Sequence, residues 1–299
     1  MRFIAAPIFA LVLTVGLASA NDRKKSDPSQ IGNRDVSKGV NFYSIEKEMA
    51  LGKQLAEEVQ RQAKVLDDPI ITEYVNRLGQ NLVRNSDAKV PFTFRVIDGP
   101  EVNAFALPGG YIFVYTGLIK MADEEDELAA ALAHEIAHVA ARHMTRNATK
   151  GQLAQIGMVP LSIGLGGLAG VAARQAASSA IIPMTFLSFG RKDEAEADYL
   201  GVQYLYSAGY DPNGAISMFE KLEMLEKTNS GAISRLFSTH PMDADRIAKT
   251  QEEINKILPS KSDYVVTSSE YSQIRERLMQ QDTRRKDALP TLKLSPAVR

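Results

Sequence analysis

The stretch EEDELAAALAHEIAHVAARHM at positions 124–144 decides the fold of this 299-residue chain. It opens with acidic side chains, which suit the partial positive charge at the start of a helix. It continues through alanine and leucine, which have high helix propensity, and it contains neither glycine nor proline. We therefore predict one continuous helix over 124–144.

This predicted helix carries His134, Glu135 and His138 in the spacing HExxH. Residues four apart are separated by about 400° of rotation, so the two imidazoles lie on one helix face and can bind the same metal ion. Glu135 is the residue after His134, so it projects from a neighbouring position round the helix, where its carboxylate can contact a water molecule bound to that ion. The chain has no cysteine and four histidines, so any metal must take nitrogen and oxygen ligands.

A catalytic zinc site takes three protein ligands, so the sequence must supply a third. His143 lies five residues beyond His138, about 500° round a continuous helix, and so it points away from the ligand face. We expect His143 to have a structural role. The acidic run at 193–198 is the better candidate, because Glu194 and Asp198 share a helix face. Glu194 can bind the metal while Asp198 accepts the ring N–H of a ligand histidine.

The remaining pattern predicts an α+β fold that is mainly helical. Apolar residues recur at helical spacing in several stretches, which we expect to form helices: 44–64, 70–82, 193–207, 212–226, 243–258 and 269–280. Aromatic and β-branched residues between turn signals predict three strands, at Phe92–Asp98, Asn103–Leu107 and Tyr111–Tyr115. These strands are expected to form a small sheet.

The two ends of the chain carry signals of their own. Residues 1–20 combine a short basic start, an apolar run and a small-residue site, so they are predicted to be a secretory signal peptide that is cleaved after Ala20. The polar residues 21–42 are predicted to be a flexible arm. We expect the main domain at 43–258 and a partly disordered C-terminal extension at 259–299.

Charge and hydropathy exclude some classes of function. The chain has 35 basic and 36 acidic residues and a formal net charge of -1, so no nucleic-acid partner is expected. The uncharged stretch 151–173 is long enough to span a bilayer, but its glycines and Pro160 make it a poor helix. We expect this stretch to form a mobile apolar flap or a peripheral contact with a membrane surface.

Four motifs in a fixed order resemble a known family. They are HExxH with the following Arg142-His143, the preceding run Asn103–Tyr111, the later run Glu194–Asp198, and Thr239-His240-Pro241 with Arg246 behind it. In this combination the chain resembles the gluzincin metallopeptidases related to the CAAX prenyl protease, HtpX, mitochondrial Oma and bacterial BepA. The resemblance covers most of residues 45–258 and implies a zincin-like domain with the small sheet packed beside the HExxH helix.

The same resemblance implies roles for individual residues. It assigns one Zn²⁺ per chain to His134, His138 and Glu194, the general base to Glu135, and a supporting role to Asp198. It also brings His240 and Arg246 into the active site, where they would stabilise an oxyanion. The sequence leaves a second role for His240 open, because a neutral imidazole could take the fourth position on zinc and hold the enzyme latent.

The predicted strand at Asn103–Leu107 suggests how a substrate binds. An edge strand beside a zinc site can pair with an extended peptide through backbone hydrogen bonds. We therefore predict that Asn103, Ala104, Phe105 and Ala106 bind substrate. Recognition of backbone rather than side chains suits unfolded or misfolded proteins.

The sequence around the four motifs indicates which members of the family the chain resembles most. The chain resembles the exported soluble members of the family rather than the membrane-embedded ones, and the roughly 40 residues after Leu258 are too few for us to expect a helical-repeat domain. The predicted function is therefore that of a periplasmic zinc endopeptidase, which hydrolyses unfolded or misfolded envelope proteins through a metal-activated water. Two alternatives stay open: a zinc-stabilised periplasmic chaperone or assembly factor with little proteolysis, and a membrane-bound processing peptidase with 151–173 inserted.

Overall fold

The computed structural model describes residues 27–163, 189–228, 240 and 245–288. The predicted signal peptide, with its cleavage site, lies outside these residues, as does the part of the uncharged stretch beyond position 163. Within the described ranges, none of the helices combines the length and the hydropathy that crossing a bilayer requires.

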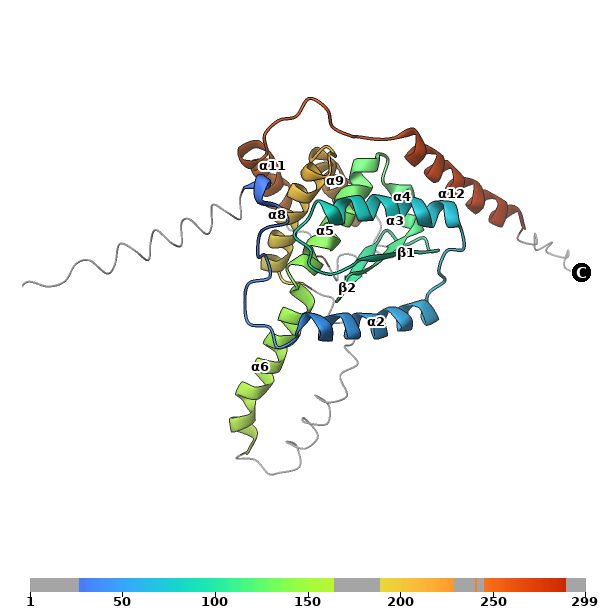
Figure 1. The fold of residues 1–299 in the computed structure, drawn as a ribbon. Helices are drawn as coiled ribbons and strands as arrows, with labels where there is room; N and C mark the ends of the chain where they lie inside the picture. Colours follow the sequence, from blue (N-terminus) through green and yellow to red (C-terminus); the bar gives the residue numbers. More distant parts are fainter. Residues whose placement is uncertain (1–26, 164–188, 229–239, 241–244, 289–299) are drawn as a thin grey trace, which may run out of the picture.

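Helices make up most of the structure and a small sheet completes it, so the predicted mainly helical α+β class is confirmed (Figure 1). The helices are α2 (Ile45–Gln62), α3 (Pro69–Arg84), α4 (Thr116–Met121), α5 (Glu125–Ala140), α6 (His143–Ile163), α8 (Arg191–Ser207), α9 (Asn213–Thr228), α11 (Asp245–Ile257) and α12 (Ser269–Ala288), with a short 3₁₀ turn at Pro28–Gln30. The strands are β1 (Thr93–Ile97), β2 (Ala104–Leu107) and β3 (Tyr111–Tyr115). Two of these helices were not expected. One is α4, because six residues are too few to give a periodic signal. The other is α6: residues 151–163 of the uncharged stretch, which we predicted to be a poor helix, continue it as regular helix, so that prediction is wrong for them.

The sheet has the strand order β1-β3-β2. β1 pairs in parallel with β3, and β2 pairs antiparallel with β3 through the register Phe105↔Phe113. The turn between β2 and β3 contains Gly109 and Gly110, whose φ angles of 74° and 95° favour glycine. β2 is therefore an edge strand of the described sheet, and it packs against α5.

The HExxH helix α5 is the buried centre of the fold, packed against α3, α8, α9 and β2. α8 crosses it closely at Gly201, where a Cβ atom would lie 3.1 Å from His134 N and 3.2 Å from His134 Cα. Because Gly201 has no side chain, the two helix backbones can approach at this point. The crossing brings Asp198 and Glu194, about one and two turns earlier in α8, towards the histidines of α5.

Substituting Gly201 with valine is expected to destabilise the protein, since the added carbons meet the α5 backbone, which cannot move aside. Overpacking of this kind costs about 1–3 kcal/mol and should lower Tm by several degrees. Calorimetry can compare Gly201→Val with Gly151→Val in α6, where a Cβ atom meets nothing within 4 Å. Equal Tm values for the two variants would contradict this account of the crossing.

The predicted single helix over 124–144 is wrong near its C-terminal end. α5 ends before Arg142, which adopts a left-handed φ of 58°, and α6 begins at His143. The Arg142 guanidinium donates to Glu48 Oε2 at 2.9 Å and to the carbonyl oxygen of Tyr43 at 2.5 Å. These contacts with α2 and the residues before it hold Arg142 in place, so α5 ends here and α6 begins as a separate helix.

Part of the predicted flexible arm is packed into the structure. Arg34 is 5% exposed, and its guanidinium donates to Asp87 Oδ2 at 2.6 and 2.9 Å and to Gln203 Oε1 at 2.6 Å. Val36 is buried in the main core. The arm prediction is therefore wrong for these residues, because their partners follow α3 and lie in α8, far along the chain.

The C-terminal helix α12 is longer than predicted and packs against the body of the protein. The Tyr271 hydroxyl donates to the carbonyl oxygen of Ala122 at 2.7 Å, and Arg277 Nε donates to Asp68 Oδ2 at 2.7 Å. Tyr271 itself is fully buried. The predicted extension thus contributes to the core through α12.

Candidate metal centre

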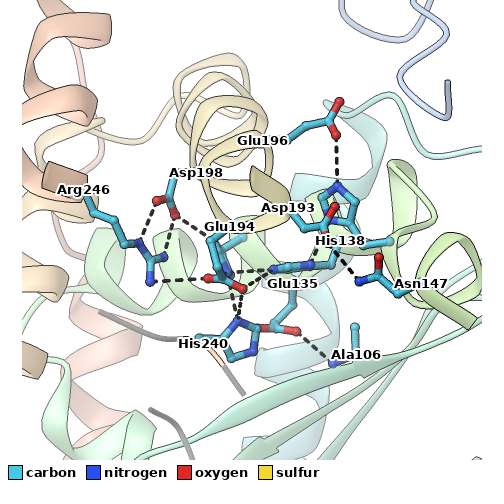
Figure 2. A network of polar contacts seen from close by, with 12 residues as sticks. Ala106, Glu135, His138, Asn147, Asp193, Glu194, Glu196, Asp198, His240 and Arg246 are labelled. Atoms are coloured by element: carbon cyan, nitrogen blue, oxygen red, sulfur yellow. Dashed lines mark hydrogen bonds and ion pairs between the residues drawn. The ribbon is translucent and has the colours of Figure 1, made fainter. Parts of the chain in front are cut away.

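Three histidines and one glutamate from three parts of the chain converge beside the sheet (Figure 2). His134 and His138 come from α5, Glu194 comes from α8, and His240 precedes α11. One ligand atom from each of the four residues lies within 4.8 Å of the others. The turn of α5 between the two histidines and the close crossing of α8 produce this convergence.

The spacing of these donor atoms fits a bound cation. His134 Nε2 lies 3.0 Å from His138 Nε2 and 3.2 Å from His240 Nδ1, and the Glu194 carboxylate lies 3.1–3.4 Å from all three rings. Bare ring nitrogens this close repel each other unless a proton or a cation lies between them. The buried Glu194 Oε2 makes no hydrogen bond within the described residues. Such a set of nitrogen and oxygen donors suits Zn²⁺ and other divalent ions.

The two glutamates at the centre differ in their electrostatics. Burial alone would raise the pKa of Glu194, but contacts with His134, His138 and His240 hold that pKa far below its ordinary value. Burial raises the pKa of Glu135, and the nearby histidines offset this only in part. Glu194 therefore stays charged and can hold a cation, whereas Glu135 is suited to take up a proton.

Asp198 and Arg246 orient His134 from its Nδ1 side, away from the other donor atoms. Asp198 Oδ1 lies 3.0 Å from His134 Nδ1, and Arg246 donates to the same carboxylate through Nε at 2.7 Å and Nη2 at 2.6 Å. Arg246 Nη1 also lies 3.3 Å from Glu194 Oε2. The arginine predicted to stabilise an oxyanion thus binds the two carboxylates that contact the histidines, as Figure 2 shows.

The side chain of Glu135 lies beside the four-residue cluster rather than in it. Glu135 Oε2 accepts a hydrogen bond from the backbone N–H of Ala106 at 2.8 Å, and Oε1 lies 3.3 Å from His240 Nε2. Glu135 is only 3% exposed. The edge strand β2 and His240 therefore fix the position of this carboxylate next to the donor atoms.

A mainly apolar cleft opens beside Glu135. Its apolar lining comes from β2, α4, α5 and α9: Ala104, Leu118, Ala130, Ala131, Ala215, Met218, Phe219 and Leu222. A second, smaller hollow lies on the side of His138, between the β2–β3 turn and Phe189. Together the two hollows flank the donor cluster.

The four residues predicted to bind substrate have different surroundings. Ala104 lines the larger cleft, and Ala106 contacts Glu135 through its backbone. The carbonyl oxygen of Asn103 accepts a hydrogen bond from β3, and the ring of Phe105 stacks on Phe113 with centroids 5.2 Å apart. Asn103 and Phe105 therefore support the sheet, while Ala104 and Ala106 lie on the side of the strand that meets the site.

Sequence reasoning missed Phe189 and Glu196, and it directed His143 away from His138. Its ring centroid lies 3.9 Å from that of Phe189, and its Nδ1 lies 2.9 Å from His143 Nδ1. His143 Nε2 in turn lies 3.1 Å from Glu196 Oε2. Glu196 stood in the acidic run that drew attention to Glu194, but the prediction of an unbroken helix pointed His143 the wrong way.

Known proteins resemble the chain over this same region. Residues 69–254 match the family described as Peptidase family M48. The "Beta-barrel assembly-enhancing protease" of Yersinia pestis is 31% identical over 88% of this chain and 56% of its own length. The "Mitochondrial metalloendopeptidase OMA1" of Schizosaccharomyces pombe is 35% identical over 60% of this chain and 52% of its own, and the "Metalloprotease LoiP" of Escherichia coli is 30% identical over 69% and 79%. The chain spans about half the length of the beta-barrel assembly-enhancing proteases that it matches.

Proposed function

The chain belongs to peptidase family M48 and is a metallopeptidase, and on this premise we propose that it is an exported zinc endopeptidase that cleaves unfolded or misfolded envelope proteins. The observation that carries the proposal is the convergence of His134, His138 and Glu194, with Glu135 next to them. Three protein donors and an adjacent carboxylate make up a catalytic rather than a purely structural metal site.

His134, His138 and Glu194 would hold the zinc ion. The bound ion supplies Lewis acidity, which lowers the pKa of a water molecule and polarises the carbonyl of the peptide bond. Asp198 keeps the His134 ring in the orientation that directs Nε2 towards the other donors. Arg246 in turn fixes the Asp198 carboxylate with two hydrogen bonds.

Glu135 acts as the general base and then as the general acid. It accepts a proton from the attacking water and later gives that proton to the leaving amine. Its burial supports this role, since a raised pKa makes a carboxylate a better proton acceptor. The hydrogen bond from Ala106 N–H keeps one carboxylate oxygen in place while the other stays directed at the site.

The cleft supports a substrate with exposed apolar side chains. Its lining is mainly apolar and includes Ala104 of β2, while Ala106 of the same strand lines the second hollow. Unfolded or misfolded proteins expose both apolar side chains and unpaired backbone, which such a surface can bind. The predicted signal peptide and the name of the Yersinia pestis relative support a substrate in the bacterial envelope.

His240 is proposed to hold the enzyme latent. Its Nδ1 lies 3.1 Å from Glu194 Oε1 and 3.2 Å from His134 Nε2, so it adds a fourth donor to the set of three. Its Nε2 lies 3.3 Å from the base Glu135. A substrate carbonyl and the attacking water need the positions that this imidazole occupies.

The same fourth donor favours a second candidate function. Structural zinc sites are closed by four protein ligands, so a zinc-stabilised chaperone or assembly factor with little proteolysis would also use His240 in this position. The buried, raised-pKa carboxylate of Glu135 favours the peptidase, because zinc ligation alone does not require a base there.

Removal of the metal is expected to stop cleavage of an unfolded protein such as casein. We expect the purified chain to lose its activity after treatment with a zinc chelator, since no protein group replaces the Lewis acid. Added Zn²⁺ should restore the activity in proportion to the metal bound, as measured by the release of casein peptides. Cleavage that continues at the full rate in metal-depleted protein would contradict the proposal.

A further inference from the structure

His143 is buried between one metal-binding histidine and a carboxylate. It is 0% exposed, with Nδ1 2.9 Å from His138 Nδ1 and Nε2 3.1 Å from Glu196 Oε2. The carboxylate of Glu196 is itself held by Arg146, whose Nη1 lies 3.2 Å away. Figure 2 shows Glu196 on the side of the site opposite Asp198. A continuous chain of contacts therefore leads from the donor cluster to an ion pair behind it.

The proton positions along this chain follow from the geometry. Nε2 is the nitrogen of His138 that faces His134 and Glu194, so metal binding requires it to be bare. The single proton of the neutral ring is then on Nδ1 and needs an acceptor. His143 Nδ1 is that acceptor, so the proton of His143 is on Nε2, where it donates to Glu196.

We propose that His143 and Glu196 are positioning residues that fix the tautomer of His138, so that its Nε2 lone pair faces the metal. This inference rests on the proposed zinc site. The two ligand histidines of α5 are thus oriented differently. Asp198 contacts His134 directly, whereas an imidazole lies between His138 and its carboxylate.

Two features of the fold make this arrangement possible. Arg142, in its left-handed conformation, separates α5 from α6, which begins at His143. This break places the His143 ring next to the ring of His138. Phe189 packs against the His138 ring, with centroids 3.9 Å apart, and lies beside the His143 ring, with centroids 6.1 Å apart. Because Phe189 is also buried, water has little access to compete for the proton between the rings.

Two substitutions of His143 test whether its side chain acts as a hydrogen-bond acceptor or only fills space. Asparagine can place an acceptor oxygen near the position of Nδ1, whereas leucine fills similar space without one. We expect His143→Leu to raise the Zn²⁺ dissociation constant about 10–100-fold, and His143→Asn to recover most of that loss. Competition with a chromogenic chelator measures this affinity without relying on peptide cleavage.

A spectroscopic measurement tests the proton positions directly. In the zinc-loaded wild type, ¹⁵N NMR of the imidazoles should show His143 as a neutral ring with its proton on Nε2. A doubly protonated His143, a proton on its Nδ1, or equal Zn²⁺ affinities for wild type and His143→Leu would each overturn the proposal. If His143→Leu does not fold, the wild-type spectrum and the Zn²⁺ affinity of His143→Asn still test the proposal. A wild type that binds no zinc would instead contradict the proposed function.

Discussion

Glu135→Gln is expected to lose peptide-bond cleavage while still binding one zinc ion. Glutamine keeps the shape of the side chain and can still accept the Ala106 hydrogen bond, but it cannot take up the proton of the attacking water. Loss of a general base lowers the rate by about 10²–10⁴-fold. Casein cleavage and zinc content, measured on the same preparation, check both parts of the expectation.

A matched control is Glu220→Gln in α9, an exposed residue next to Phe219 of the cleft. It makes the same chemical change outside the metal site and should cleave at the wild-type rate. A zinc-loaded Glu135→Gln protein that cleaves as fast as this control would remove Glu135 from the mechanism. Loss of zinc from Glu135→Gln would show instead that Glu135 helps to hold the metal.

His240→Ala is expected to raise the rate of cleavage several-fold. The substitution removes the fourth donor and leaves three protein ligands, which is the pattern of catalytic zinc sites. It also frees Glu135 Oε1 from the contact at 3.3 Å. The measurement is kcat/KM on unfolded casein for wild type and variant at equal zinc occupancy.

The double variant His240→Ala, Glu135→Gln serves as the control and should be inactive, because any gained activity must still pass through the same base. A lower rate in His240→Ala would contradict the latent state. Such a result would assign His240 the other role that the sequence left open, stabilisation of the oxyanion.

The helix that carries the site could be predicted from the sequence because the information is local. Acidic residues followed by alanine and leucine specify α5, and the spacing of four places His134 and His138 on one face. The same argument in α8 picked out Glu194 and Asp198 as neighbours on one face, and the ligand atom of Glu194 lies within 4.8 Å of those of the histidines.

The end of that helix could not be predicted, because its cause lies elsewhere in the chain. Arg142 adopts a left-handed conformation while its guanidinium binds Glu48 and Tyr43, about 95 residues away. No local signal marks a stop, since arginine is a good helix former. The error carried over to His143, which a continuous helix would turn away from His138.

Partners that depend on the packing of distant segments were also missed. Arg246 was assigned to the reaction because of its place in a motif, but its planar guanidinium lies against Asp198 with two hydrogen bonds. Arg34 stood in a polar stretch typical of a loose arm, yet Asp87 and Gln203 bind it in the interior. Composition does not show where such a charge finds its partner.

The position of the metal tests the central claim most directly. We would crystallise the purified chain without added chelator and record anomalous scattering on both sides of the zinc absorption edge. The account predicts one zinc peak per chain, at about 2.0–2.2 Å from His134 Nε2, His138 Nε2 and a carboxylate oxygen of Glu194. The absence of a peak there, or a zinc ion bound without these three residues, would contradict it.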